Sequence, residues 1–178
     1  MNPSMTSMPD MTPSTARPAP APHRPGRKPL YTPQERARRD ASRWTMWQGV
    51  LAPVQLLVCL VSLVLVSRWL ATGQGGELAT ASVLLKTGLL AAIMITGCLW
   101  EHDVYGQYLF APAFFWEDFV SMYVILMHVI FLLMWLGGAP MDMQFKVAVA
   151  AYVLYIVNAA QFLLKLRAAR KSPGLVAA

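Results

Sequence analysis

Charged residues are scarce in this chain: only 13% of its 178 residues are Asp, Glu, Lys or Arg. A soluble domain carries roughly 25% of such residues, so this composition excludes an ordinary soluble domain. Cysteine is scarce as well. Cys59 and Cys98 both lie inside apolar runs, at different depths. They predict small buried side chains and argue against a disulfide or a cysteine metal site.

Short catalytic and nucleotide-binding motifs are also missing. The sequence contains no GxGxxG, no P-loop, no HExxH and no nucleophile elbow. These absences argue against the nucleotide, zinc-protease and serine-hydrolase chemistries that such motifs support. His102 and His128 fall at different levels, so a haem held by two histidines is not expected. We expect chemistry without a cofactor, or with a ligand that leaves no short motif.

The chain contains long apolar runs. Four runs each approach the roughly 20 residues that cross a bilayer core. They cover residues 49–71, 78–100, 118–137 and 145–166. The predicted fold class is therefore all-α, an integral membrane four-helix bundle with no room for a second globular domain. No apolar run precedes residue 49, which argues against a cleavable signal peptide.

Composition divides the chain into three parts. Residues 1–29 are rich in Pro, Ser, Thr and Met and show no apolar period, which predicts a disordered tail. Residues 30–171 form the predicted four-span membrane domain, and residues 172–178 form a C-terminal tail.

A short helix is expected ahead of the first span, within residues 30–48. Thr32 followed by Pro33 predicts a helix start, with Thr32 as the cap and Pro33 in the first turn. A basic run follows, and Trp44 and Trp47 stand just before the span. Basic residues with aromatic anchors are typical of a helix at the membrane interface.

Basic residues gather before the first span and after the last. Eight precede the first span: Arg17, Arg24, Arg27, Lys28, Arg36, Arg38, Arg39 and Arg43. Four cluster at the C-terminal end: Lys165, Arg167, Arg170 and Lys171. An even number of spans places both termini on one side, and the positive-inside rule makes that side the cytoplasm. The net charge of +6 then serves orientation and contact with membrane lipids, and we expect no nucleic-acid partner.

The most unusual connector is WEHDVYGQYLFAPAFFWED, residues 100–118. It is aromatic, contains no Lys or Arg, and has four carboxylates: Glu101, Asp103, Glu117 and Asp118. The topology places it on the cytoplasmic side. Titratable groups where hydrocarbon meets water predict a functional site. The alternative is that these carboxylates only cap and flank helix ends, above all Asp103 and Asp118.

Polar residues inside the spans share helical faces. Three faces combine Gln48, Gln55 and Ser62; Glu117, Ser121 and His128; and Asn158 and Lys165. We expect these faces to point into the bundle because polar groups are costly in lipid. Most of the residues fall in the cytoplasmic half, where a pocket beside the acidic connector would collect them.

Several of these residues have more than one interpretation. Gln55 and Asn158 either line the pocket or only hydrogen-bond across helices. His128 is an ordinary interior histidine, an axial ligand to a metal macrocycle, or a general acid or base. Lys86 looks deep in the second run, and we expect its long stem to carry the ammonium towards the interface.

Five segments carry a resemblance to a known family. In chain order they are LYTPQERARRDASRWT, QGVLAPVQLLVCLVSLVLV, LATASVLLKT, WEHDVYGQYLFAPAFFWED and AAYVLYIVNAAQFLLKLRAAR. Together they resemble the 3-vinyl bacteriochlorophyllide hydratase family of bacteriochlorophyll biosynthesis, over about residues 30–170. The resemblance implies addition of water to the ring-A vinyl group of a chlorophyllide or bacteriochlorophyllide, giving a 1-hydroxyethyl group. It carries over no catalytic motif residue by residue.

The implied substrate is a large flat macrocycle with a central magnesium and a propionate carboxylate. An aromatic cytoplasmic mouth could admit it from the bilayer. Hydration needs an acid for the terminal vinyl carbon and a base for the attacking water. Glu101 and Glu117 end one span and start the next, so we assign the pair to them. Asp103 and Asp118 are the less favoured members.

The remaining candidates are assigned to substrate binding. We expect His128 to bind the magnesium or to position water. Lys165 or Arg167 would pair with the propionate at the cytoplasmic interface. Gln55, Ser121 and Asn158 would complete the polar lining of the pocket.

A second class of function would use the same pocket: a non-enzymatic pigment-binding or assembly protein. A small transporter or a quinone or haem protein is disfavoured, because the sequence has no histidine pair and no inverted repeat. The resemblance implies a pigment as partner and a bacterial inner or intracytoplasmic photosynthetic membrane. It leaves open a homo-oligomer or a complex with other pigment-biosynthesis enzymes.

Overall fold

The computed structural model describes residues 30–171, and within them the chain forms five helices and no strand. Their bounds are α1 Pro33–Ala41, α2 Arg43–Thr72, α3 Gly76–Tyr105, α4 Phe115–Leu136 and α5 Met141–Lys171. The helices α2 to α5 are long and apolar enough to cross a membrane. The predicted all-α class is confirmed, and each predicted span coincides with one of these four helices. The predicted tails, residues 1–29 and 172–178, lie outside the described residues.

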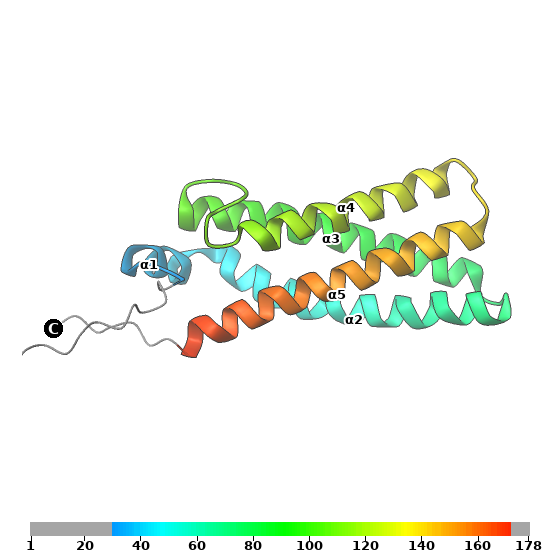
Figure 1. The fold of residues 1–178 in the computed structure, drawn as a ribbon, viewed down its shortest axis with the longest axis horizontal. Coiled ribbons are helices and arrows are strands. Elements are labelled where there is room, and N and C mark those ends of the chain that lie inside the picture. The colour runs from blue at the N-terminus through cyan, green and yellow to red at the C-terminus, as the bar shows by residue number, and fades with distance from the viewer. Residues whose placement is uncertain (1–29, 172–178) are drawn as a thin grey trace, which may run out of the picture.

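The four long helices are arranged as two antiparallel hairpins (Figure 1). The helix α2 packs mainly against α3, and α4 packs mainly against α5, so packing is closer within the hairpins than between them. At one end of the bundle, residues 73–75 connect α2 to α3 and residues 137–140 connect α4 to α5. Residues 106–114 join the two hairpins at the other end, where α1 and the C-terminal end of α5 also lie.

The first hairpin turns within three residues because glycine is available at both ends of the turn. Gly73 ends α2 at φ +71°, and Gly75 precedes α3 at φ +79°. A side chain is strained in this left-handed region, whereas glycine adopts it readily. The tight turn keeps α2 and α3 side by side along their whole length.

One face of each long helix is buried at the seam between the hairpins. The predicted polar faces point inward, since Gln55 and Ser62 on α2 and Ser121 and His128 on α4 are all buried. Apolar residues at helical spacing pack around them, namely Val66, Ala79, Val83, Leu90, Val124, Phe131 and Phe145. The interior is therefore apolar with a polar stripe.

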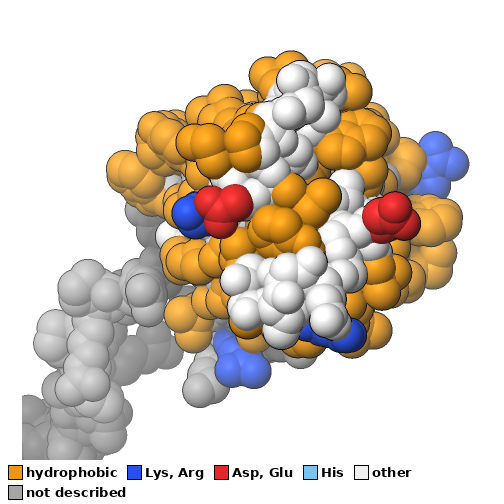
Figure 2. Space-filling model, turned by 90° about the vertical axis from the view of Figure 1, so that its right-hand side faces the viewer, with side chains coloured by type: hydrophobic (Ala, Val, Ile, Leu, Met, Phe, Trp, Pro, Cys, Tyr) orange, Lys and Arg blue, Asp and Glu red, His pale blue; other side chains and the backbone are white. Residues whose placement is uncertain are grey.

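The outer faces of the bundle are apolar. Large exposed side chains such as Leu57, Val64, Leu85 and Leu133 point away from the interior. Figure 2 looks onto the end that holds the two hairpin turns and shows hydrophobic side chains around isolated charged ones. Apolar outer faces are what lipid contact requires of a membrane-spanning helix.

The short helix ahead of the first span forms where the sequence predicts its start. Thr32 Oγ1 accepts a hydrogen bond from Glu35 N–H at 3.2 Å, and Glu35 Oε2 accepts one from Thr32 N–H at 2.7 Å. The helix ends sooner than expected. Ser42 has an extended backbone conformation that interrupts the helix, and its side chain caps the start of α2. Trp44 and Trp47 therefore belong to the start of α2 and not to the short helix.

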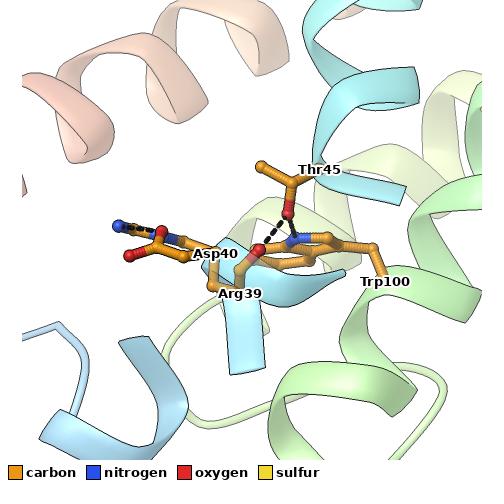
Figure 3. A network of polar contacts seen from close by, with 4 residues as sticks. All are labelled: Arg39, Asp40, Thr45 and Trp100. Atoms are coloured by element: carbon orange, nitrogen blue, oxygen red, sulfur yellow. Dashed lines mark hydrogen bonds and ion pairs between the residues drawn. The ribbon is translucent and has the colours of Figure 1, made fainter. Parts of the chain in front are cut away.

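A small polar network fastens α1 to α3 (Figure 3). Thr45 Oγ1 donates a hydrogen bond to the Arg39 carbonyl oxygen at 2.6 Å. The same hydroxyl accepts one from Trp100 Nε1 at 3.0 Å. Arg39 also pairs with its neighbour Asp40 at 2.6 Å. One threonine hydroxyl thus ties the end of α1 to the cytoplasm-facing end predicted for α3.

Candidate active site

The acidic connector is shorter than the sequence predicts, because both flanking helices extend into it. Only residues 106–114 are non-helical. The four carboxylates therefore lie on helices: Glu101 and Asp103 near the end of α3, and Glu117 and Asp118 in the first turn of α4. Their relative positions are fixed by rigid elements and not by a loop.

The carboxyl groups of Glu101 and Asp118 face each other across the α3–α4 contact and interact electrostatically. Each residue is only 5% exposed. An ionised carboxylate has acceptors but no donor, so a hydrogen bond between two carboxyl groups needs a proton on one of them. Two carboxyl groups buried this close favour a state in which they share one proton.

Two successive backbone amides of the connector complete this pair. Phe110 N–H donates to Asp118 Oδ2 at 2.8 Å, and Ala111 N–H donates to Glu101 Oε2 at 3.3 Å. Phe110 adopts φ +60°, a conformation that is strained for a residue with a side chain. Strain of this kind clusters at functional sites. Here it accompanies the contact of both amides with the carboxyl pair.

Helix dipoles decide where the shared proton resides. Asp118 stands in the first turn of α4, at the positive end of that helix. Glu101 stands close to the C-terminal end of α3, where the dipole is negative. Negative charge is stabilised at the first position and disfavoured at the second. The charge is therefore favoured on Asp118 and the proton on Glu101.

Glu117 does not lie against Glu101 as the sequence analysis expected. Its carboxylate forms an ion pair with Lys165 of α5. The expected pairing of Glu101 with Glu117 is corrected to Glu101 with Asp118, because adjacent helical residues point about 100° apart. Lys165, expected to bind a propionate, already has a carboxylate partner inside the protein. Its ammonium also lies 5.0 Å from the centre of the Phe114 ring.

Asp103 lies apart from the buried pair. Its side chain is exposed and accepts a hydrogen bond from Ser42 Oγ at 2.7 Å. This contact joins α3 to the junction between α1 and α2. The position fits the interpretation of Asp103 as a carboxylate that flanks a helix end.

Polar side chains continue the site one turn deeper into the bundle. Asn158 Nδ2 donates to Ser121 Oγ at 2.7 Å, and Ser121 Oγ donates to the Glu117 carbonyl oxygen at 2.9 Å. Asn158 Oδ1 and Gln55 Nε2 are buried and have no hydrogen-bond partner within the described part of the chain. The structure thus joins Ser121 to Asn158 as helix-bridging residues. It leaves one acceptor and one donor free for a ligand.

His128 belongs to a layer deeper still. Its Nδ1 lies 2.7 Å from the Val124 carbonyl oxygen, and its ring centre lies 6.0 Å from that of Tyr152. The Tyr152 hydroxyl lies 2.6 Å from Ser62 Oγ. Within the described part of the chain, no three or more His, Cys, Asp or Glu side chains are placed to hold a metal ion.

Lys86 lies in the same layer, and the expectation that it reaches the interface is wrong. Its side chain is fully buried, and Nζ lies 3.6 Å from the centre of the Tyr155 ring. The sequence did contain a signal for this placement. Ala79, Val83 and Leu90 are buried on the same face of α3 as Lys86. Spacings of three and four residues mark one helical face.

Two other features could not be found from the sequence. The strained backbone of Phe110 has no signature, because non-glycine residues rarely adopt positive φ. Tyr152 is one aromatic residue among several in the last span, and nothing in the sequence distinguishes it from the others. Its burial and its bond to Ser62 give it a place beside His128.

Comparison with known proteins gives one consistent result. The family model described as 2-vinyl bacteriochlorophyllide hydratase matches residues 31–168. A curated 2-vinyl bacteriochlorophyllide hydratase from Rhodobacter capsulatus is 57% identical over 150 residues, which cover 84% of this chain and 88% of the relative. The protein of the same name from Cereibacter sphaeroides is also 57% identical over 150 residues, covering 84% and 91%. No solved structure matches.

Proposed function

The chain belongs to the 2-vinyl bacteriochlorophyllide hydratase family, and from this we propose how its own residues add water to a vinyl group. The protein is a hydro-lyase of bacteriochlorophyll biosynthesis. The resemblance found in the sequence is confirmed, and the two family names differ only in the number of the vinyl position. The observation that carries the proposed mechanism is the buried Glu101–Asp118 pair.

The reaction adds a proton to the terminal vinyl carbon and a hydroxyl group to the carbon beside the ring. Protonation breaks the π bond, forms a C–H bond and leaves a cation that the macrocycle delocalises. Water then forms the C–O bond and gives up a proton. The product is a 1-hydroxyethyl group. The reaction therefore needs one proton donor and one proton acceptor close together.

Glu101 is the proton donor in this proposal and Asp118 the acceptor. Glu101 holds the shared proton for the vinyl carbon, while the Asp118 carboxylate takes the proton of the attacking water. Each turnover removes one proton from the pair and returns one. The hydrogen bond between the two carboxyl groups passes the returned proton back to Glu101. The pair is thus restored without a further reactant.

Polar groups deeper in the seam would orient the pigment. The free Asn158 Oδ1 and Gln55 Nε2 offer one acceptor and one donor to the edge of the macrocycle. The hydroxyl of Ser121 stands one turn from Asp118, where it can position the attacking water. These roles keep the sequence-based assignment of all three residues to substrate binding.

An aromatic surface on α4 suits the approach of a flat apolar pigment from the bilayer. Phe115, Trp116, Phe119 and Tyr123 are all exposed. The ring centres of successive members lie 5.5, 6.1 and 5.3 Å apart. Aromatic rings bind flat π-systems by stacking and edge contacts. This surface begins at the same helix end as Asp118, so it leads to the carboxyl pair.

Hydration in deuterated water tests this mechanism. We expect the product to contain one deuterium on its new methyl carbon, because Glu101 exchanges its proton with solvent before donating it. Mass spectrometry of the pigment after incubation with membranes measures the label. Product with no deuterium on carbon would contradict proton donation by an exchangeable group. Pigment binding without any hydroxyethyl product would instead support the pigment-carrier alternative.

We also propose that both ends of the chain face the cytoplasm of a bacterial inner or intracytoplasmic membrane. The basic residues ahead of α2 support this orientation through the positive-inside rule. It places residues 73–75 outside and residues 106–114 inside.

Labelling of introduced cysteines tests the orientation. A membrane-impermeant maleimide should label Gln74→Cys in spheroplasts and should leave Arg38→Cys unlabelled, since both positions are exposed but lie at opposite ends of the bundle. The unmodified protein, whose Cys59 and Cys98 lie within α2 and α3, is the background control. Labelling of Arg38→Cys alone would reverse the topology.

A further inference from the structure

Two buried ionisable side chains deep in the bundle each have a nitrogen atom without a hydrogen-bond partner among residues 30–171. These atoms are Lys86 Nζ on α3 and His128 Nε2 on α4. The two residues are only 0% and 1% exposed, and they lie close enough to interact electrostatically. Buried polar groups in folded proteins almost always have partners, so an unpartnered one calls for an explanation. Two such groups in one layer indicate a ligand that supplies both partners.

His128 presents a lone pair because its other ring nitrogen is already in use. The Val124 carbonyl oxygen can only accept a hydrogen bond, so Nδ1 carries the proton and Nε2 does not. Histidines that bind a metal through one nitrogen commonly donate the other N–H to a backbone carbonyl in this way. His128 therefore has the protonation and orientation of a metal ligand.

Lys86 presents a cation without an anion. Its ammonium contacts the face of the Tyr155 ring but has no hydrogen-bond partner among the described residues. By contrast, Lys165 is paired with Glu117, and Lys146 with Asp142. An ionisable residue inside a membrane span is costly and typically marks the path or binding place of a ligand. The missing partner of Lys86 is an anionic group.

We propose that this layer binds two features of the pigment at once. His128 Nε2 is an axial ligand of the central magnesium, and Lys86 pairs with the propionate carboxylate. The inference rests on the proposed function for the identity of the pigment. A bacteriochlorophyllide has a free propionate, whereas an esterified pigment does not. Lys86 therefore selects the free acid over the ester.

His128 and Lys86 lie at different depths below the Glu101–Asp118 pair. His128 lies ten residues beyond Asp118 on α4, a rise of about 15 Å. Lys86 lies fifteen residues before Glu101 on α3, a rise of about 22 Å. The magnesium site thus falls between the propionate site and the Glu101–Asp118 pair.

The seam between the hairpins provides the plane in which a flat ring lies. Lys86 belongs to the α2–α3 hairpin and His128 to the α4–α5 hairpin, and the two hairpins are packed less closely against each other than within themselves. Tyr152 and Tyr155 of α5 already contact His128 and Lys86 through their rings. A macrocycle that parts the hairpins would meet all four side chains.

Equilibrium binding of four pigments to the purified protein tests the proposal. Each pigment carries an ethyl group in place of the vinyl group, so no hydration takes place. The four differ only in whether magnesium is present and whether the propionate is free or methyl-esterified. The test variants are Lys86→Met and His128→Leu. The matched controls, Lys146→Met and His102→Leu, change exposed residues of the same types.

We expect the unmodified protein to bind the free acid more tightly than the ester by about tenfold or more. We also expect it to bind the magnesium pigment more tightly than the metal-free one. Lys86→Met should remove the first preference and keep the second, and His128→Leu should do the reverse. Each variant is expected to keep one of the two binding preferences, and that retained preference shows that the variant is folded. The vibrational spectrum of the pigment should report a lost axial ligand in His128→Leu alone.

Three results would overturn the proposal. They are equal binding of acid and ester by the unmodified protein, an acid preference that survives Lys86→Met, and a magnesium preference that survives His128→Leu. Hydration of the vinyl pigment is measured separately on the unmodified protein. Failure of the binding preferences with hydration intact would therefore refute this inference and leave the proposed function standing.

Discussion

Replacement of Glu101 by Gln should reduce the rate of vinyl hydration by about 10²–10⁴-fold, the usual contribution of a general acid. Glutamine keeps the size of the side chain and can still hydrogen-bond to Asp118, but it has no proton that it can transfer to carbon. Water is a poor substitute donor because Glu101 is only 5% exposed. The rate of hydroxyethyl product formation in isolated membranes measures the effect.

Asp103→Asn is the matched control for this experiment. It removes a carboxylate from the same turn of α3, but from an exposed position whose partner is Ser42. We expect this variant to keep most of its activity. If the Glu101→Gln and Asp103→Asn proteins hydrated the pigment at similar rates, Glu101 could not be the acid.

The second large effect is expected at Asp118. Asp118→Asn should reduce hydration by about 10²–10⁴-fold, because the attacking water loses its base and Glu101 loses the partner that returns its proton. Glu117→Gln changes the neighbouring residue and should keep most of its activity per folded molecule. The two variants therefore separate the pair seen in the structure from the pair expected from the sequence.

Glu117→Gln should instead lower the stability of the protein. Lys165 would lose its carboxylate while remaining only 26% exposed. Breaking a fully buried ion pair costs roughly 3–5 kcal/mol, and the cost here should be smaller because water reaches part of the lysine. Adding Lys165→Met should restore much of the loss in a thermal unfolding measurement. Loss of activity in Glu117→Gln at unchanged stability would give Glu117 the catalytic role.

The sequence predicts the spans and their inward faces well, because both follow from simple physical rules. Four apolar runs are long enough to cross a bilayer, and all four are helices. Gln55, Ser121, His128 and Asn158 are buried as their helical spacing predicts. Thr32 caps the first helix as expected. These features depend on local pattern alone.

The pairing of carboxylates is harder to predict, because it depends on how the connector folds. Glu117 and Asp118 differ by one helical step, so the start of α4 and its rotation decide which of them meets Glu101. That rotation is held in part by the strained backbone of Phe110, which local propensity opposes. The burial of Lys86 is hard to predict for a different reason. A long stem can reach the interface in principle, and only its packing against Tyr155 shows that it does not.

The two carboxyl groups that share a proton come from different hairpins, Glu101 from α3 and Asp118 from α4. Separation of the hairpins at the connector end would therefore separate the two carboxyl groups, and neither group alone would hold the shared proton. The proposed acid is complete only while the connector ends of the two hairpins stay together. This requirement matters for a magnesium chlorin, which acid readily demetallates. An acid built from two hairpins would confine proton donation to a pigment whose vinyl group lies at the connector end of the bundle.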